Sequence, residues 1–225
     1  MSRTSLKTVL LCITLLMFGA ASAYADNFSI VTSRPSGTDT IDWGQFGPPF
    51  TQLMSPADWI SMNGAMGTAS DSGTLERRDE GNGWDGIFAF GDHLLWNQDN
   101  GNAIDIHFNS PISMGGAQIQ DDDFGAFMGC VQALGSFGAS PVFCVAGNND
   151  GSEMNTAPFI GIQDLSGGHI TDLLFTTDVG PNATAINSLS FSASGATTPE
   201  PTSMLLLGSG LLTAAGVLKR RRRLP

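Results

Sequence analysis

The chain has 225 residues and a formal charge of −11, a length that fits one domain or two small ones. Between residues 26 and 199 only three arginines stand against 20 acidic residues, a net charge of −17, so phosphate backbones are repelled and nucleic acid is excluded as a partner. The same stretch contains no lysine and no tyrosine, which excludes Schiff-base chemistry and tyrosine nucleophiles.

Residues 1–25 have the three parts of a secretory signal peptide. Arg3 and Lys7 form a basic start, residues 9–20 are apolar, and Ala23-Tyr24-Ala25 fits a cleavage site. A second small-residue site lies two residues earlier, and an uncleaved membrane anchor is the alternative. We expect cleavage after residue 25 and export of the chain from residue 26 onward.

Residues 26–196 are predicted to form one extracytoplasmic all-β domain. Helical periodicity is nearly absent, while short alternating segments recur between turn residues. Such a pattern predicts an antiparallel, jelly-roll-like β-sandwich. The first part, residues 26–83, is less clearly patterned and is expected to hold a first set of strands and long loops. Candidate strands lie at 28–33, 86–90, 103–108, 118–120, 124–133, 141–146, 159–163, 170–176 and 185–192.

Three histidines, at positions 93, 107 and 169, are isolated in the sequence and lack the spacing of a helical metal pair. His107 alternates onto the polar face of its candidate strand together with Asp105, which indicates a surface position. We therefore assign no ligand role to the histidines.

Cys130 and Cys144 are the cysteines that remain after removal of the signal peptide. A hairpin that turns near Phe137 would place them opposite each other, which predicts a disulfide in an exported protein. Closing a loop of about 15 residues contributes roughly 3 kcal/mol in the chain-entropy account. A catalytic thiolate is the alternative, and it requires a reduced cysteine.

Two acidic loops are candidate calcium sites. Asp121, Asp122 and Asp123 form one, and Asp150 lies in the other, within residues 148–153. Calcium prefers six to eight oxygen ligands from such loops, but neither segment matches the EF-hand pattern. The alternative is that both are solvated turns.

No enzyme motif accompanies these loops: the chain lacks a G-x-S-x-G elbow, an H-E-x-x-H helix and a P-loop. We expect no catalytic activity. All four tryptophans lie in the first half of the domain, and at least two are expected in the core. Trp84 stands in a glycine-rich turn and is the candidate for an exposed ring that stacks on a glycan.

The C-terminal residues 197–225 form a three-part tail. Pro199, Glu200 and Pro201 precede an apolar run at 202–218, which is about 25 Å long as a helix and predicts a single short membrane span. A basic cluster comes next and is expected to stay in the cytoplasm as a stop-transfer signal: Lys219, Arg220, Arg221, Arg222 and Arg223. A plain anchor that is never processed is the alternative.

This tail resembles the PEP-CTERM sorting domain. The resemblance implies recognition of the Pro199-Glu200-Pro201 segment by an exosortase, a transpeptidase-like membrane enzyme. It further implies an inner-membrane anchor before processing, and then a place at the cell surface or in the extracellular matrix among exopolysaccharide and biofilm. Two functions result as hypotheses: a non-enzymatic surface or matrix protein, or a carbohydrate-binding module that holds exopolysaccharide with the help of calcium.

Overall fold

The computed structural model describes residues 27–36, 38–98, 102–136, 138–152, 154–178 and 183–194. The predicted signal peptide at 1–25 and the predicted membrane helix at 202–218 lie outside these residues. Within the described ranges, no helix is long and apolar enough to cross a membrane.

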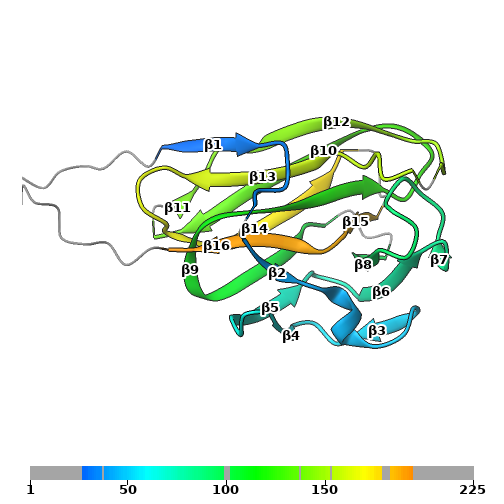
Figure 1. Ribbon diagram of the computed structural model, residues 1–225, viewed down its shortest axis with the longest axis horizontal. Helices are drawn as coiled ribbons and strands as arrows, with labels where there is room; N and C mark the ends of the chain where they lie inside the picture. The colour runs from blue at the N-terminus through cyan, green and yellow to red at the C-terminus, as the bar shows by residue number, and fades with distance from the viewer. Residues whose placement is uncertain are drawn as a thin grey trace, which may run out of the picture.

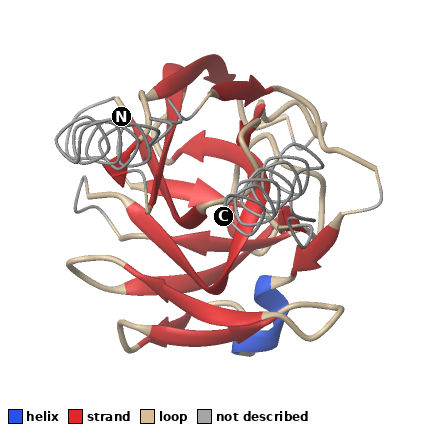
Figure 2. Ribbon diagram, turned by 90° about the vertical axis from the view of Figure 1, so that its left-hand side faces the viewer, coloured by secondary structure: helices blue, strands red, loops and turns tan. Residues whose placement is uncertain are grey.

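The described part of the chain is built almost entirely from β-strands, as Figure 2 shows. One 3-10 helix, Trp43–Phe46, is capped at its N-terminus by Asp42, whose carboxylate accepts a hydrogen bond from the Gly44 N–H. The strands are β1 (Phe28–Val31), β2 (Asp39–Ile41), β3 (Thr51–Leu53), β4 (Ala57–Ile60), β5 (Met66–Ser70), β6 (Leu75–Glu80), β7 (Gly83–Trp84), β8 (His93–Trp96), β9 (Ile104–Asp121), β10 (Gly125–Gly135), β11 (Gly138–Ala139), β12 (Phe143–Asn149), β13 (Phe159–Asp164), β14 (Ile170–Thr177), β15 (Thr184–Ile186) and β16 (Leu189–Ala193).

Strand β9 organises the domain because it changes partners along its length (Figure 1). Its first part lies between β5 and β14, its middle between β13 and β16, and its last residues pair with β15. His107 pairs with Asp172 of β14, yet the next pair along β14 is Ile170 with Ile112, so residues 108–111 bulge away from β14, while Phe108 still pairs with Gly67 of β5. A bulge of this kind bends the strand and lets it serve different neighbours.

Nearly all the pairing between the described strands is antiparallel, with the short β6–β7 pair parallel. The longest path of neighbours runs β11-β10-β14-β9-β15-β8-β6-β3. The all-β antiparallel prediction is therefore confirmed. The hydrogen bonds join the strands into one network through β9, and the finer division into a jelly-roll-like sandwich stays a prediction.

The alternation of apolar and polar side chains along the strands determines which side chains form the hydrophobic core. Ile104, Ile106 and Phe108 are buried, as the sequence pattern predicts for one face of β9. A second apolar cluster at the end of β9 comprises Trp84, Ile87, Phe88, Leu94, Trp96, Phe127, Ala157, Ala183 and Ala185.

Four of the candidate strands were wrong in detail. The candidates at 103–108 and 118–120 are parts of the single strand β9. Residues 86–90 form a loop, because the Glu80 carboxylate accepts the N–H groups of Gly86 and Phe88 and the Gln120 side chain accepts that of Ile87. Residues 185–192 divide into β15 and β16 at Asn187, whose side-chain oxygen accepts the Gln118 N–H in place of a backbone oxygen.

The described domain begins and ends on the same side, at the left of Figure 1. Phe28 at the start of β1 pairs with Asp164 at the end of β13, and Ala193 at the end of β16 pairs with Ile112 beside the β9 bulge. Strand β7 lies at the opposite side. We call that side the distal end; its loops are residues 47–50, 81–82, 85–92, 122–124, 150–152 and 154–158.

Candidate functional site

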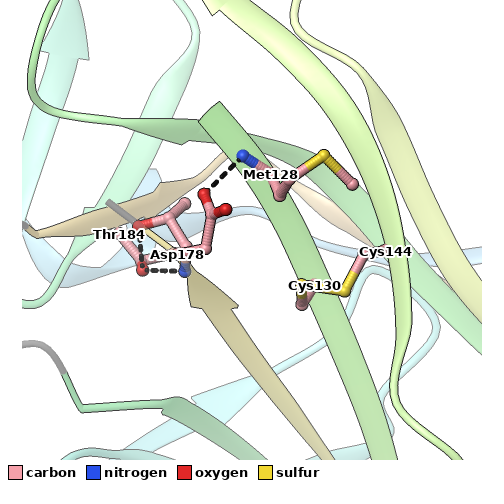
Figure 3. The surroundings of a disulfide bond; sticks show 6 residues. Met128, Cys130, Cys144, Asp178 and Thr184 are labelled. Carbon is pink, nitrogen blue, oxygen red and sulfur yellow. Dashed lines mark hydrogen bonds between the residues drawn. A yellow bond between two sulfur atoms is a disulfide. The ribbon is translucent and has the colours of Figure 1, made fainter. Parts of the chain in front are cut away.

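The disulfide predicted from the sequence joins two adjacent strands. Cys130 of β10 pairs directly with Cys144 of β12, and their sulfur atoms are bonded (Figure 3). On the other side of β10, the Asp178 carboxylate accepts a hydrogen bond from the Met128 N–H at 2.6 Å. The disulfide thus fastens β12, which pairs with β10 alone, to the rest of the sheet.

The two acidic loops meet at the distal end. Gly125 pairs with Asn149, and the Asn149 amide donates to the backbone oxygens of Asp121 and Asp123 at 3.2 and 3.3 Å. Asp121 is fully buried, and its carboxylate accepts from the Asp123 N–H and the Thr177 hydroxyl. Burial raises the pKa of Asp121 against the lowering effect of these hydrogen bonds.

This arrangement gives the calcium hypothesis no ligand cluster. Among the residues that the structure describes, no group of three or more His, Cys, Asp or Glu side chains is placed to hold a metal ion. Asp150 accepts the N–H of Ser152 in a local turn, while Asp122 and Asp123 are exposed. Calcium at Asp121, Asp122, Asp123 and Asp150 stays a prediction, and the observed contacts are those of turns.

The four tryptophans are all buried, which corrects the expectation of an exposed ring at Trp84. Their exposed fractions are 0% for Trp43, 2% for Trp59, 6% for Trp84 and 8% for Trp96. Trp84 packs edge-on against Trp96 with ring centroids 6.0 Å apart. The glycine-rich surroundings of Trp84 predicted an exposed turn; instead Gly86 leaves room for the ring, since a Cβ there would lie 2.5 Å from Trp84 Nε1.

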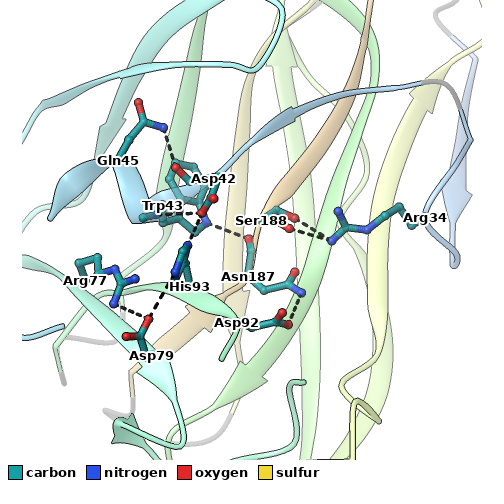
Figure 4. Close-up of polar contacts among 11 residues, drawn as sticks. Arg34, Asp42, Trp43, Gln45, Arg77, Asp79, Asp92, His93, Asn187 and Ser188 are labelled. Atoms are coloured by element: carbon teal, nitrogen blue, oxygen red, sulfur yellow. Dashed lines mark hydrogen bonds and ion pairs between the residues drawn. The ribbon is translucent and has the colours of Figure 1, made fainter. Parts of the chain in front are cut away.

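Each histidine contacts an aspartate, although sequence spacing indicated isolated residues. His107 Nδ1 lies 2.7 Å from Asp172, and His169 Nδ1 lies 3.0 Å from Asp164. His93 Nδ1 lies 2.6 Å from Asp42, beside the ion pair of Arg77 and Asp79 (Figure 4). The partners come from distant strands or a neighbouring loop, so no sequence motif could have identified them.

The pKa values of the Asp42 and Asp164 carboxylates are both lowered. Burial alone would raise the pKa of Asp42, but hydrogen bonds from Gly44 and His93 lower it. The pKa of Asp164 is likewise lowered, because hydrogen bonds from Ser166 and His169 outweigh burial. Both are arrangements that hold a loop in place.

The pKa of Asp105, in contrast, is raised. Burial raises its pKa to about 6, and the neighbouring Asp172 carboxylate adds to the rise while His107 opposes it. Its Oδ1 atom is buried and has no hydrogen-bond partner among the described residues. On the β9–β14 face Asp105 thus carries the raised pKa, next to the contact between His107 and Asp172.

Sequence reasoning missed three exposed aromatic residues at the distal end. Phe50, Phe90 and Phe124 have 56%, 73% and 66% of their surface exposed. Each stands in a turn-rich segment next to glycine or proline, and that combination is the signal that could have found them. In the described ranges these rings, and not the tryptophans, offer aromatic surface to a ligand.

The sorting motif residues Pro199, Glu200 and Pro201 and the basic cluster at 219–223 lie outside the described residues. No curated protein matches the chain. Residues 197–223 match the PEP-CTERM protein-sorting motif, which indicates export, processing by an exosortase and a membrane-anchored surface protein in general. The chain is therefore a PEP-CTERM motif-containing protein, whose motif follows an all-β domain.

Proposed function

We propose that this is a non-enzymatic surface or extracellular-matrix protein, which an exosortase-type system sorts and which associates with exopolysaccharide in a biofilm. The observation that carries the proposal is the sorting motif at residues 197–223, which begins three residues after the last described residue of the β domain. In this proposal the membrane helix at 202–218 holds the protein in the inner membrane until processing, and the jelly-roll-like domain is then displayed outside the cytoplasm.

The contacts within the domain support a role without catalysis. Asp172 lies between His107 and Thr171, so the hydroxyl donates to a carboxylate at 2.6 Å instead of to an imidazole. A nucleophile would need the imidazole as its base. The Cys130–Cys144 disulfide leaves neither cysteine as a thiolate.

Sorting is tested by following the full-length chain in a bacterium that contains an exosortase. We expect the wild-type chain to be shortened and recovered at the cell surface. Replacing Pro199, Glu200 and Pro201 together by alanine should leave the chain at full length in the inner membrane. The matched control replaces three described residues of a distal loop, Asp122, Asp123 and Phe124, and should be processed normally. Equal processing of wild type and the Pro199-Glu200-Pro201 variant would refute the proposal.

A carbohydrate-binding module is the second candidate. Burial removes Trp84 as its stacking ring, but the exposed phenylalanine rings at the distal end favour the same class of ligand. Calcium assistance belongs to this candidate, and equal glycan binding in calcium and in chelator would remove it.

A further inference from the structure

We infer that the distal end is a glycan-binding surface, on which Phe50 and Phe90 stack against a polysaccharide that carries no anionic groups. The inference rests on the proposed display outside the cytoplasm and deepens its second candidate. Five features support it. These are the rigid support of the Phe50 ring, the Phe90 ring beyond a glycine turn, the polar residues around both rings, the negative charge of the distal loops, and the position of the distal end relative to the sorting tail.

The Phe50 ring packs against the Arg78 side chain, which in turn packs against Trp96. The Arg78 guanidinium lies 4.5 Å from the centroid of the Phe50 ring and 4.5 Å from that of Trp96, so it is held between the two. Arg78 also pairs with Glu76 and donates to the Gly83 oxygen. Arg78 therefore cannot turn away, and Phe50 rests on a fixed support with over half of its surface exposed.

The backbone at Phe50 is strained in a way that holds the ring at this place. Its φ of 69° is uncommon for any residue with a side chain and a true outlier for a bulky one. Its N–H bonds to the Arg77 oxygen at 2.8 Å, which holds the residue in position. Strain of this kind persists when the surroundings impose it, and it gathers at ligand-binding positions.

Phe90 lies on the other side of the turn that contains Gly81 and Gly83. A Cβ at Gly81 would lie 2.4 Å from the Phe90 ring, and a Cβ at Gly83 would lie 2.7 Å from the Phe50 ring. Both glycines have positive φ and present bare backbone to the rings. Two exposed aromatic rings thus flank one short turn, an arrangement that suits successive units of an extended chain.

The rings stand among polar groups instead of forming one apolar patch. Asn82 is exposed in the turn between Gly81 and Gly83, and Asp85 is exposed near Phe124, since both Asp85 and Phe124 approach within 3.5 Å of a Cβ built at Gly151. A stable protein interface needs a contiguous, largely apolar centre. Isolated rings with amide and carboxylate acceptors on the same end of the domain suit sugar rings, whose C–H faces stack while the hydroxyl groups donate.

Charge selects among polysaccharides. The distal loops carry exposed Asp85, Asp122, Asp123 and Asp150. Between residues 26 and 199 the basic residues are Arg34, Arg77 and Arg78; Arg77 is buried with Asp79, and Arg78 is held between its two rings. Polymers with carboxylate or sulfate groups would be repelled, which leaves neutral and amino-bearing chains.

The surface is also correctly placed for display. The domain's last described strand, β16, ends at the side opposite the distal end (Figure 1), and the sorting motif comes after that strand in sequence. A protein held through its C-terminal tail would therefore have its aromatic end available to material outside the cell.

The test is retention of the detergent-solubilised full-length chain on cellulose and on chitosan beads, with alginate beads as the anionic comparison. We expect retention on cellulose or chitosan and not on alginate. Phe50→Ala and Phe90→Ala should each weaken retention about tenfold, because each loses the burial of one aromatic ring. Phe50→Tyr keeps the ring and should retain binding, and Leu165→Ala, an exposed apolar residue at the other end, is the matched control.

Thermal unfolding of each variant separates loss of binding from loss of the fold. Phe90→Ala is the decisive variant, since its ring is the more exposed of the two. Absence of retention on both cellulose and chitosan, stronger retention on alginate, or unchanged retention in both alanine variants would overturn the inference. So would light scattering that shows a dimer for the wild-type chain and a monomer for the Phe50→Ala and Phe90→Ala variants, because the rings would then be covered by a second copy. Normal exosortase sorting together with any of these results would leave the proposed sorting intact.

Discussion

Cys130 lies directly opposite Cys144 in the register of β10 and β12, so their disulfide closes the hairpin that these strands form. The two residues are 14 apart in sequence, and closing a loop of this size contributes roughly 3 kcal/mol through the entropy of the unfolded chain. We expect the Cys130→Ala/Cys144→Ala double variant to lose about that much unfolding free energy, as measured by urea denaturation.

A reductant provides the control for this prediction. It should destabilise the wild-type protein and leave the double variant unchanged. Equal stability of oxidised wild type and double variant would show that other contacts alone hold β12 in place.

The raised pKa of Asp105 makes stability depend on pH. Its pKa is about 6 in the folded state against about 3.9 when unfolded, so the folded protein binds a proton more tightly. The stability that this provides is fully present below about pH 4 and is lost as the pH rises through about 6. Asp105→Asn should therefore gain about 1–2 kcal/mol relative to wild type between pH 4 and pH 7.5, after allowing for solvent screening.

Urea denaturation of both proteins at several pH values checks this. The comparison must be between variants, because Asp121 has a raised pKa too, whereas the pKa values of Asp42 and Asp164 are lowered. A constant difference between Asp105→Asn and wild type across this range would contradict the prediction.

Asp164 holds the loop between β13 and β14 and is predicted to stabilise the fold. Its buried carboxylate accepts hydrogen bonds from both the N–H and hydroxyl of Ser166, the N–H of Gly168, and the N–H and Nδ1 of His169. Asp164→Ala should lower the unfolding free energy by about 2–3 kcal/mol at pH 7, since several donors lose their acceptor.

The pH profile of that variant depends on the lowered pKa of Asp164. The contribution of the carboxylate is present above the unfolded pKa of about 3.9 and is lost as the pH falls through the folded value, so the deficit should shrink in acid. Asp150→Ala is the matched control: its carboxylate accepts the Ser152 N–H in an exposed turn, and its loss should cost less than about 1 kcal/mol. A larger effect at Asp150 than at Asp164 would refute this assignment.

Local patterns predicted strand faces and one strand pairing well, and strand ends poorly. The alternation in residues 103–108 fixes which side of β9 is buried, because the side-chain period of a strand is two. The hairpin symmetry about Phe137 likewise predicted the Cys130–Cys144 register. Residues 86–90 have a strand-like composition, but the Glu80 and Gln120 side chains take up their N–H groups, a tertiary contact with no local signal.

The candidate sites also differ in how well the sequence predicted them, because some depend on local segments and others on tertiary contacts. The sorting motif is a contiguous segment and could be recognised directly. The Asp105–His107–Asp172 group forms across two strands, and exposure of Phe50 depends on Arg78 and Trp96 beneath it. Exposure and pairing of this kind depend on register and packing, which composition does not determine.

Trp84 provides the sharpest test of the corrected core. Because its ring is buried against Trp96 in the apolar cluster at the end of β9, Trp84→Ala should destabilise the domain by about 3–5 kcal/mol. Phe90→Ala removes an exposed ring and should change the unfolding free energy by less than about 1 kcal/mol. Thermal or urea denaturation of the two variants measures both values. A Trp84 variant as stable as the Phe90 variant would return Trp84 to the surface and reopen it as the ring that stacks on a glycan.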